Sequence, residues 1–396
     1  MKIVMIGQKG IPTRSGGIEK HVEALSVELA KRKHKIIVYT RPHYTDKTLK
    51  HYKGVKLISL PSINSKHFDT ASHSFIATFH ALFKIKNIDI IHYHGIGPSL
   101  FLWIPRIINP KIKVLSTFHC RDYEHQKWSF FARTVLKLGE LCSVYFSHQT
   151  IVVSKNLKQY IKNRYQRKAV YVPNGIYPTI NKKHSNKSDE KRLSWWNIKP
   201  KKYILTVDRL VRHKGLHTLI RAYQQLSPES QQAKKLVIVG DSSFTDDYLK
   251  ELKAMAKNNH NIIFTGQQTG RSLRILFQNA YLFVHPSESE GMSLSLLEAL
   301  NYNLPVLTSN IPANLELVKD YGFTFKNRDY YDLSEKLNLI LDLPGRILEK
   351  KSALAQKKIA EIYSWEKIVY STEKLYINLL ASNKSRIPFA VKIKKV

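Results

Sequence analysis

The stretch from His285 to Ala299 combines two carboxylates with a predicted helix start. Glu290 precedes Gly291, and seven residues separate it from Glu298. The apolar spacing predicts a helix from about Ser293, which places Glu290 on a loop and Glu298 in the second helical turn. Carboxylates accept hydrogen bonds from sugar hydroxyls, and the free N–H groups at a helix start attract anions. The alternative is that acidic residues near a helix N-terminus are favoured simply by the helix dipole. That would explain Glu290 but not the whole run from His285 to Ala299.

Two cations five residues apart, Arg209 and Lys214, follow a predicted strand at Tyr203–Val207. On one turn, a guanidinium fork and an ammonium point charge can clamp a diphosphate. The alternative is a pair of solvated cations in a chain that is rich in them. Their position at the carboxyl end of a strand favours the clamp, because ligands of parallel sheets bind at that edge.

A glycine-rich loop with Gly7, Gly10, Gly16 and Gly17 follows the first predicted strand and opens a helix. Glycines let backbone N–H groups approach a phosphate, and the helix N-terminus adds positive potential. The loop is not G-x-G-x-x-G, and it lacks the Lys-Ser/Thr ending of a P-loop. A plain strand-to-helix turn is therefore an equal alternative.

Three histidines, His92, His94 and His119, stand at the ends of two predicted strands. A metal site is one interpretation, but no carboxylate cluster accompanies them. Neutral imidazoles that form hydrogen bonds or handle protons are favoured instead. A capping or packing role for any single histidine stays open.

Short apolar runs alternate with helical patterns along both halves of the chain, which predicts parallel sheets covered by helices. Strands are predicted in the first half at Lys2–Ile6, Lys35–Tyr39, Val55–Leu60, Asp89–His94, Val114–Phe118 and Thr150–Val153. Those of the second half are Tyr203–Val207, Lys235–Val239, Ile262–Thr265, Leu282–Val284 and Pro305–Thr308. Predicted helices include Ile18–Lys31, Leu216–Leu226, Leu294–Asn301 and Ser364–Leu380. The fold class is therefore α/β, with two tandem doubly wound, Rossmann-like domains facing across a cleft.

The domain boundaries follow from a shift in composition. We expect residues 1–180 to form the first domain and residues 201–363 the second. The polar and basic stretch between them predicts a linker at residues 181–200. The helix within residues 364–382 is expected to pack back on the first domain, ahead of a basic tail at residues 383–396.

The composition excludes several classes of protein. The chain has 396 residues, a formal net charge of +34 and two cysteines, which rules out a disulfide framework and a four-cysteine zinc site. No apolar run reaches the ~18–20 residues of a membrane span, and the start is predicted to be a strand rather than a signal peptide. We therefore expect a cytoplasmic protein with an anionic partner: nucleic acid, a membrane surface or a phosphorylated ligand. A lysine-rich proteome would explain the charge without any partner.

Taken together, these residues resemble the GT-B glycosyltransferases of family 4, also called glycosyl transferases group 1. The Glu290…Glu298 element is similar to the signature of that family. The segments around it occur in the same order as the family's other motifs, and the resemblance covers about residues 1–380. The agreeing segments are Val207-Asp-Arg209-Leu, Lys214-Gly215, Val239-Gly240, Phe264-Thr-Gly266, His285-Pro-Ser and Leu304-Pro-Val306. The amino-terminal Gly-Gln-Lys-Gly-Ile-Pro and the stretch His119…Trp128 resemble a branch that builds bacterial surface polysaccharides, including rhamnosyltransferases.

The resemblance implies a role for each matching residue. Arg209 and Lys214 would bind the donor diphosphate, Glu298 the nucleotide ribose, and Glu290 the hydroxyls of the transferred sugar. His119 would contact the sugar or the acceptor at the reaction centre. Backbone groups would complete the donor site at Gly16, Gly17, Gly291, Met292, Ser293 and Leu294, with Val239–Asp241 around Gly240 and Thr265–Gln267 around Gly266 bordering the base. Asn303 stands where the family usually has glycine, and asparagine tolerates the left-handed backbone of that turn.

The resemblance also implies a retaining transferase with no cofactor and no obligatory metal, since cations and helix N-termini take the charge of the leaving group. The sequence contains no Asp-x-Asp run of the metal-dependent transferases. The leaving phosphate would take the proton of the acceptor.

Acceptors of this branch are lipid-diphosphate-linked saccharides at the inner membrane face. The aromatic and basic stretches Trp128–Lys137 and Lys158–Lys168 suit an anionic interface, although a core helix and a solvated face are the alternatives. The enzyme is thus predicted to be cytoplasmic and peripheral on the membrane.

Two rival functions stay open from the sequence. One is a sugar-nucleotide epimerase or phosphorylase on the same architecture. The other is a basic nucleic-acid-binding protein, although no helix-turn-helix, zinc finger or RNP-like pattern appears. Because the resemblance favours a glycosyltransferase and no nucleic-acid-binding motif appears, we expect a nucleotide-sugar donor as the ligand and no specific nucleic acid.

Overall fold

The computed structural model describes residues 1–65, 68–124, 128–179, 187–242 and 246–382. It divides the chain into two compact units. Unit 1 comprises Met1–Gly175 together with the segment that starts at Trp365, and unit 2 comprises Ile176–Ser364. The predicted basic tail, residues 383–396, lies outside the described residues.

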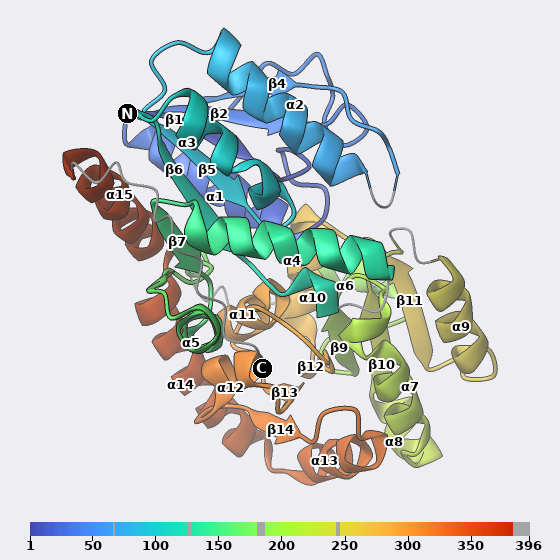
Figure 1. Ribbon diagram of the computed structural model, residues 1–396. Coiled ribbons are helices and arrows are strands. Elements are labelled where there is room, and N and C mark those ends of the chain that lie inside the picture. The colour runs from blue at the N-terminus through green and yellow to red at the C-terminus, as the bar shows by residue number, and fades with distance from the viewer. Residues whose placement is uncertain (66–67, 125–127, 180–186, 243–245, 383–396) are drawn as a thin grey trace. The chain divides into compact units, whose positions relative to one another are not determined.

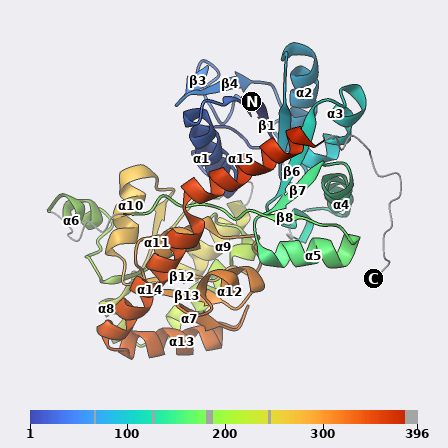
Figure 2. The same cartoon turned by 90° about the vertical axis from the view of Figure 1, so that its left-hand side faces the viewer.

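Unit 1 is built on a sheet with the strand order β3-β4-β2-β1-β5-β6-β7-β8. Figure 1 labels β1, β2, β4, β5, β6 and β7, and Figure 2 labels β3 and β8. Its strands are β1 (Lys2–Ile6), β2 (Lys35–Thr40), β3 (His51–Tyr52), β4 (Val55–Ser59), β5 (Ile90–His94), β6 (Lys113–Phe118), β7 (Gln149–Val152) and β8 (Val170–Tyr171). Its helices are α1 (Gly17–Lys31), α2 (Asp69–Lys84), η1 (Pro98–Phe101), α3 (Trp103–Ile108), η2 (Asp122–Glu124), α4 (Phe130–Tyr145), α5 (Lys155–Tyr165) and α15 (Trp365–Ala381). The strand pairs are parallel except β3–β4, an antiparallel hairpin that the sequence analysis did not predict.

Alternating side chains of β1 enter two different cores of unit 1. Ile3 and Met5 pack with residues of α1 and α15 on one face, whereas Val4 and Ile6 pack with residues of α2 on the other. This follows from the two-residue period of a strand, and it is why a central parallel strand is apolar throughout.

The carboxyl-terminal helix α15 packs on unit 1 beside α1, as Figure 2 shows. Its Glu373 binds Arg32 and His34 at 2.7 and 2.6 Å. Trp365 is buried against Gly175, where a Cβ would overlap the indole ring. The last helix therefore belongs to the core of the amino-terminal unit.

Unit 2 has a parallel sheet with the order β11-β10-β9-β12-β13-β14. Its strands are β9 (Tyr203–Val207), β10 (Lys235–Val239), β11 (Ile262–Gly266), β12 (Leu282–His285), β13 (Val306–Ser309) and β14 (Phe323–Phe325). Its helices are α6 (Lys187–Ser194), η3 (Arg212–Lys214), α7 (Leu216–Gln224), α8 (Pro228–Ala233), α9 (Asp246–Ala256), α10 (Gly270–Asn279), α11 (Leu294–Asn301), α12 (Pro312–Val318), α13 (Tyr330–Asp342) and α14 (Gly345–Tyr363).

The units do not divide where the composition shifts. Residues 176–179 belong to unit 2, because Ile176 donates its N–H to Tyr363 and Thr179 bonds to Asn301. Part of the predicted linker forms α6, which packs on α10 through contacts that include a hydrogen bond from Arg271. Its polar composition reflects a solvated helix face rather than missing structure. No helix among the described residues combines the length and apolarity that a membrane crossing needs.

Candidate functional site

The polar residues of unit 2 gather at the carboxyl ends of β9 and β12. Asp208 follows β9 and His285 ends β12, while Lys214 lies on the short helix η3 and Glu290 on the loop before α11. The Lys214 ammonium binds Asp208 Oδ1 at 2.8 Å and also binds Glu290 Oε1. The His285 ring lies between the same carboxylates, with Nδ1 3.0 Å from Asp208 and Nε2 3.1 Å from Glu290. We call these four residues the charge cluster.

Burial and neighbouring charges shift the pKa values of Lys214, His285 and Glu290. Burial opposes charge on Lys214, yet Asp208 and Glu290 raise the pKa of its ammonium. Burial also disfavours the imidazolium, but the same carboxylates raise the pKa of His285 above its ordinary value. Lys214 and His285 in turn hold the pKa of Glu290 well below its usual range, against the effect of burial. The cluster therefore favours an ionised Glu290 beside a permanent cation.

The two cations predicted to form a clamp are held differently. Lys214 is buried and engaged by two carboxylates, which leaves one of its three ammonium protons for a further acceptor. Arg209 is exposed, and its guanidinium binds no other side chain among the described residues. Two turns of one β9–α7 connection thus present one fixed and one available cation.

Gly240 and Gly266 hold neighbouring strand ends close together. Gly240 follows β10, and a Cβ there would overlap the carbonyl of Asp208. Its N–H donates to the Gly266 carbonyl at 3.0 Å, and the Asp208 N–H donates to Val239 at the same distance. Gly240 is therefore required for packing behind the charge cluster, whereas a Cβ at Gly266 would meet open space.

Helix α11 starts where the sequence predicts. Ser293 caps it, and its hydroxyl accepts the Leu296 N–H. Glu298 lies in the second helical turn and is half-buried, whereas Gly291 and Met292 are buried in the preceding loop. Asn303, which ends the turn after α11, has a φ of +60°, as its left-handed role requires.

In unit 1, hydrogen bonds from its backbone to side chains outside it hold the glycine-rich loop in place. Glu19 accepts the Lys9 N–H at 3.0 Å, and the Tyr44 hydroxyl accepts the N–H groups of Arg14 and Ser15 at 2.8 Å each. The N-cap of α1 is Gly16, with a φ of +102°. A Cβ there would overlap the Glu19 carboxylate, so glycine is needed at this turn. Gly17 begins the helix.

Four buried histidines lie beside that loop, at the carboxyl ends of β5 and β6 and on α1. His94 Nδ1 lies 3.4 Å from His119 Nε2, and the His21 ring stands edge-on to His119 with 5.0 Å between ring centroids. His21 bonds to Asn174, and His92 to Thr117 and Tyr376. Burial lowers the pKa of His21 to about 4 and of His92 to about 3, and it lowers those of His94 and His119 as well. These imidazoles are neutral at physiological pH.

Two groups of side chains among the described residues have the ligand types of a metal site. In each group the ligand atoms lie within 4.8 Å of one another: Asp208, His285 and Glu290 in unit 2, and His21, His94 and His119 in unit 1. In the first, a metal ion would compete with the Lys214 ammonium. In the second, three neutral imidazoles offer lone pairs. Independence from metal stays a prediction.

The structure brings the predicted residues together within each unit. In unit 2, Arg209, Lys214 and Glu290 lie at the carboxyl ends of the strands, together with Gly240 and Gly266. In unit 1, Gly16, Gly17 and His119 lie at the carboxyl ends of its own strands. Sequence reasoning missed Asp208, His285 and His21 as site residues. The first two stand at strand carboxyl ends inside segments that were already recognised, which is the signal that could have found them.

Comparisons with known proteins agree with this architecture. Residues 15–179 match the family model "Glycosyltransferase Family 4", and residues 188–360 match "Glycosyl transferases group 1". An uncharacterized glycosyltransferase of Methanocaldococcus jannaschii is 26% identical over 95% of this chain and 98% of its own. The O-antigen biosynthesis glycosyltransferase WclY of Escherichia coli is 26% identical over 74% of this chain and 80% of its own. The structure of HepE from Anabaena in complex with UDP and glucose has a TM-score of 0.78 at 19% identity, covering 96% of this chain and all of that one.

Two Rossmann-like units with polar residues at their strand ends define a protein of the GT-B class. The two family models together span most of the chain, which belongs to the family 4 (group 1) glycosyltransferases and is a transferase enzyme.

Proposed function

We propose that the enzyme transfers a sugar, with retention of configuration, from a nucleotide-diphosphate sugar to a lipid-linked saccharide of surface polysaccharide synthesis. The charge cluster carries this proposal, because it holds a buried ammonium and an ionised carboxylate at one sheet edge beside the exposed Arg209. The UDP and glucose in the HepE structure support a nucleotide-sugar donor, and the O-antigen relative supports a saccharide acceptor.

Each residue has a distinct task on the proposed path. Arg209 and the remaining proton of Lys214 donate to the diphosphate, and the second carboxylate oxygen of Glu290 accepts from a sugar hydroxyl. Glu298 binds the ribose. The neutral His119 accepts from or donates to the sugar or the acceptor at the reaction centre.

The reaction balances without an added base. The bond from the anomeric carbon to the donor phosphate oxygen breaks, and a bond to the acceptor oxygen forms on the same face. The acceptor proton passes to the leaving phosphate, whose charge Arg209 and Lys214 stabilise as it develops.

A lipid-linked acceptor requires work at a membrane surface. The first turn of α4 supports this, because Phe130 and Phe131 are 88% and 73% exposed. That exposure overturns the alternative of a core helix for this stretch. We therefore propose a peripheral enzyme on the inner face of the membrane.

Thermal unfolding with UDP, GDP or dTDP in EDTA tests the donor assignment. A nucleotide at ~100 times its dissociation constant stabilises the folded state by about 2.7 kcal/mol. We expect one nucleotide to raise the midpoint in the wild type and to fail in Arg209→Met. If none of the three shifts the midpoint of the wild type, the donor assignment is wrong.

A further inference from the structure

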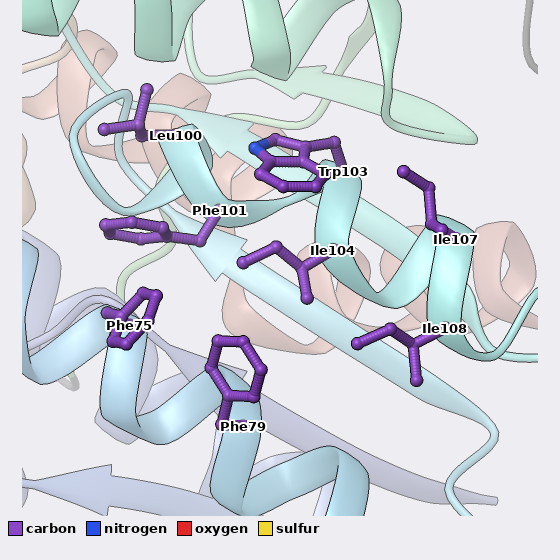
Figure 3. A pocket seen from close by; sticks show the side chains of 8 residues that line it. All are labelled: Phe75, Phe79, Leu100, Phe101, Trp103, Ile104, Ile107 and Ile108. Carbon is purple, nitrogen blue, oxygen red and sulfur yellow. The ribbon is translucent and has the colours of Figure 1, made fainter.

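An apolar groove lies between α2 and α3 of unit 1. It has a volume of about 450 Å³, and every residue that lines it is apolar: Phe75, Phe79, Leu100, Phe101, Trp103, Ile104, Ile107 and Ile108. Figure 3 shows the α2 aromatics facing the side chains of η1 and α3 across the opening. The Phe75 ring stands edge-on to Phe101, with 5.5 Å between centroids, and packs on Phe79 at 4.8 Å.

The side chains around this groove are unusually exposed for their type. Ile107 is 61% exposed, Ile108 47%, and Trp103 41%. On α2, Phe75 is 46% exposed, and Phe83, which stacks on Phe79, is 66% exposed. Single exposed apolar residues are ordinary, but a contiguous set along two adjacent helices marks an interaction surface.

The charges near the groove are positive. Lys84 ends α2, Lys86 follows it, and Lys111 follows α3; all three are exposed. Between residues 70 and 112 the sequence contains one carboxylate, Asp89, which accepts the Lys2 N–H at 2.6 Å. The groove therefore presents hydrocarbon in its floor and available ammonium groups where the helices end.

We propose that this groove docks the enzyme on an anionic phospholipid bilayer, with the side chains of α3 inserted among the acyl chains. Apolar side chains next to lysines gain from both phases of such an interface, and tryptophan prefers its boundary. Each lysine near the surface adds to the attraction. The inference rests on the proposed function in one respect, the need for a lipid-linked acceptor, and it moves the main contact from α4 to the α2–α3 face.

A second copy of the chain is the other occupant to consider. A pairing of two copies through this face would set one positively charged surface against another, with no available carboxylate between residues 70 and 112 to offset the lysines. Like charges across an interface oppose association. Charge complementarity thus favours the anionic lipid surface.

Flotation of the full-length enzyme with vesicles of phosphatidylglycerol and phosphatidylcholine tests the proposal. Ile107→Glu/Ile108→Glu is expected to lower binding to phosphatidylglycerol vesicles by about tenfold or more, because two inserted side chains are lost. The control is Leu339→Glu/Leu354→Glu in unit 2, where both leucines are about half exposed and the charge changes equally. This control is expected to float almost like the wild type.

A second measurement locates the insertion directly. Phospholipids brominated in the acyl chain quench tryptophans that enter the hydrocarbon, so Trp103→Phe is expected to lose most of the quenching that the wild type shows. Equal flotation of the groove variant and the control would overturn the proposal. So would loss of flotation in Phe130→Glu/Phe131→Glu alone, which would place the contact on α4, or a concentration-dependent dimer that only the groove variant abolishes.

Nucleotide-induced shifts in the unfolding midpoint, measured without vesicles, keep the two proposals separate. A groove variant with a normal shift and lost flotation supports docking. A wild type that floats but shows no shift would contradict the donor assignment and leave the docking result standing.

Discussion

Replacing Lys214 by methionine removes the ammonium group of the charge cluster and keeps most of the side-chain volume. Asp208 and Glu290 would then share the His285 ring as their remaining basic partner. Removing one partner of a buried ion pair costs about 3–5 kcal/mol, since the other charge stays buried without compensation. With an m-value of about 2 kcal/mol/M, the urea midpoint of unit 2 falls by roughly 2 M.

The assay is unfolding in urea, monitored by hydrogen exchange in peptides from β9 and β12. Peptides from β1 and β5 of unit 1 serve as the internal reference and should not change. Arg209→Met is the matched control. Removal of the exposed guanidinium should lower the free energy of unfolding by less than about 0.5 kcal/mol, although we expect nucleotide binding to be lost. In Lys214→Met/Glu290→Gln the charges balance again, so the double variant should lose about 1–3 kcal/mol less than the sum of the single variants.

Two results would refute this reasoning. If Lys214→Met unfolds at the wild-type urea concentration, the ammonium is not a buried counterion of the two carboxylates. If the effects of Lys214→Met and Glu290→Gln simply add, the two side chains act independently and the charge cluster is not one electrostatic unit.

Three further predictions concern the frame around the sites. Because burial lowers the pKa of His21 to about 4, the imidazole binds a proton more readily in the unfolded chain than in the folded one as the pH falls below about 6.5. This group alone should lower the unfolding free energy of unit 1 by up to ~1.4 kcal/mol per pH unit. His21→Asn should therefore flatten the profile of unfolding free energy against pH. Gly240→Ala should weaken nucleotide binding and lower the unfolding midpoint more than Gly266→Ala, since only the first Cβ overlaps a backbone carbonyl; equal effects would contradict the packing argument. Trp365→Ala should cost about 3–5 kcal/mol in urea unfolding of unit 1, against less than about 0.5 kcal/mol for the exposed Tyr370→Ala on the same helix.

The strands that frame the site could be predicted because each is a short and mostly apolar run with a turn after it. The predicted ranges of β1, β9 and β10 agree with the structure residue for residue, and α11 begins and ends as its spacing predicts. The short strands β3, β8 and β14 escaped prediction, since two or three residues carry no period. Their pairing depends on neighbours that the sequence does not identify.

The contacts within the charge cluster could not be predicted in the same way. Lys214 and Glu290 lie 76 positions apart, and each has a plausible separate partner in the sequence. Only the parallel order of β9 and β12 brings their turns together. The groove on α2 and α3 was missed for a related reason: amphipathic helices predict a buried face, but nothing local says that a second apolar face stays uncovered.

The proposed role of Lys214, a fixed cation beside a developing negative charge, is compatible with a stable fold because of the charge cluster around it. Two carboxylates and two basic groups offset one another, so the buried site is close to neutral when His285 is protonated. The balance holds Lys214 in place before any ligand arrives, and charge stabilisation by a preorganised group requires no rearrangement during the reaction. On the proposed path, Arg209, exposed and unconstrained by such partners, is the cation that moves with the departing phosphate. We therefore propose that a fixed and a mobile cation on one short connection divide between them the binding and the release of the leaving group.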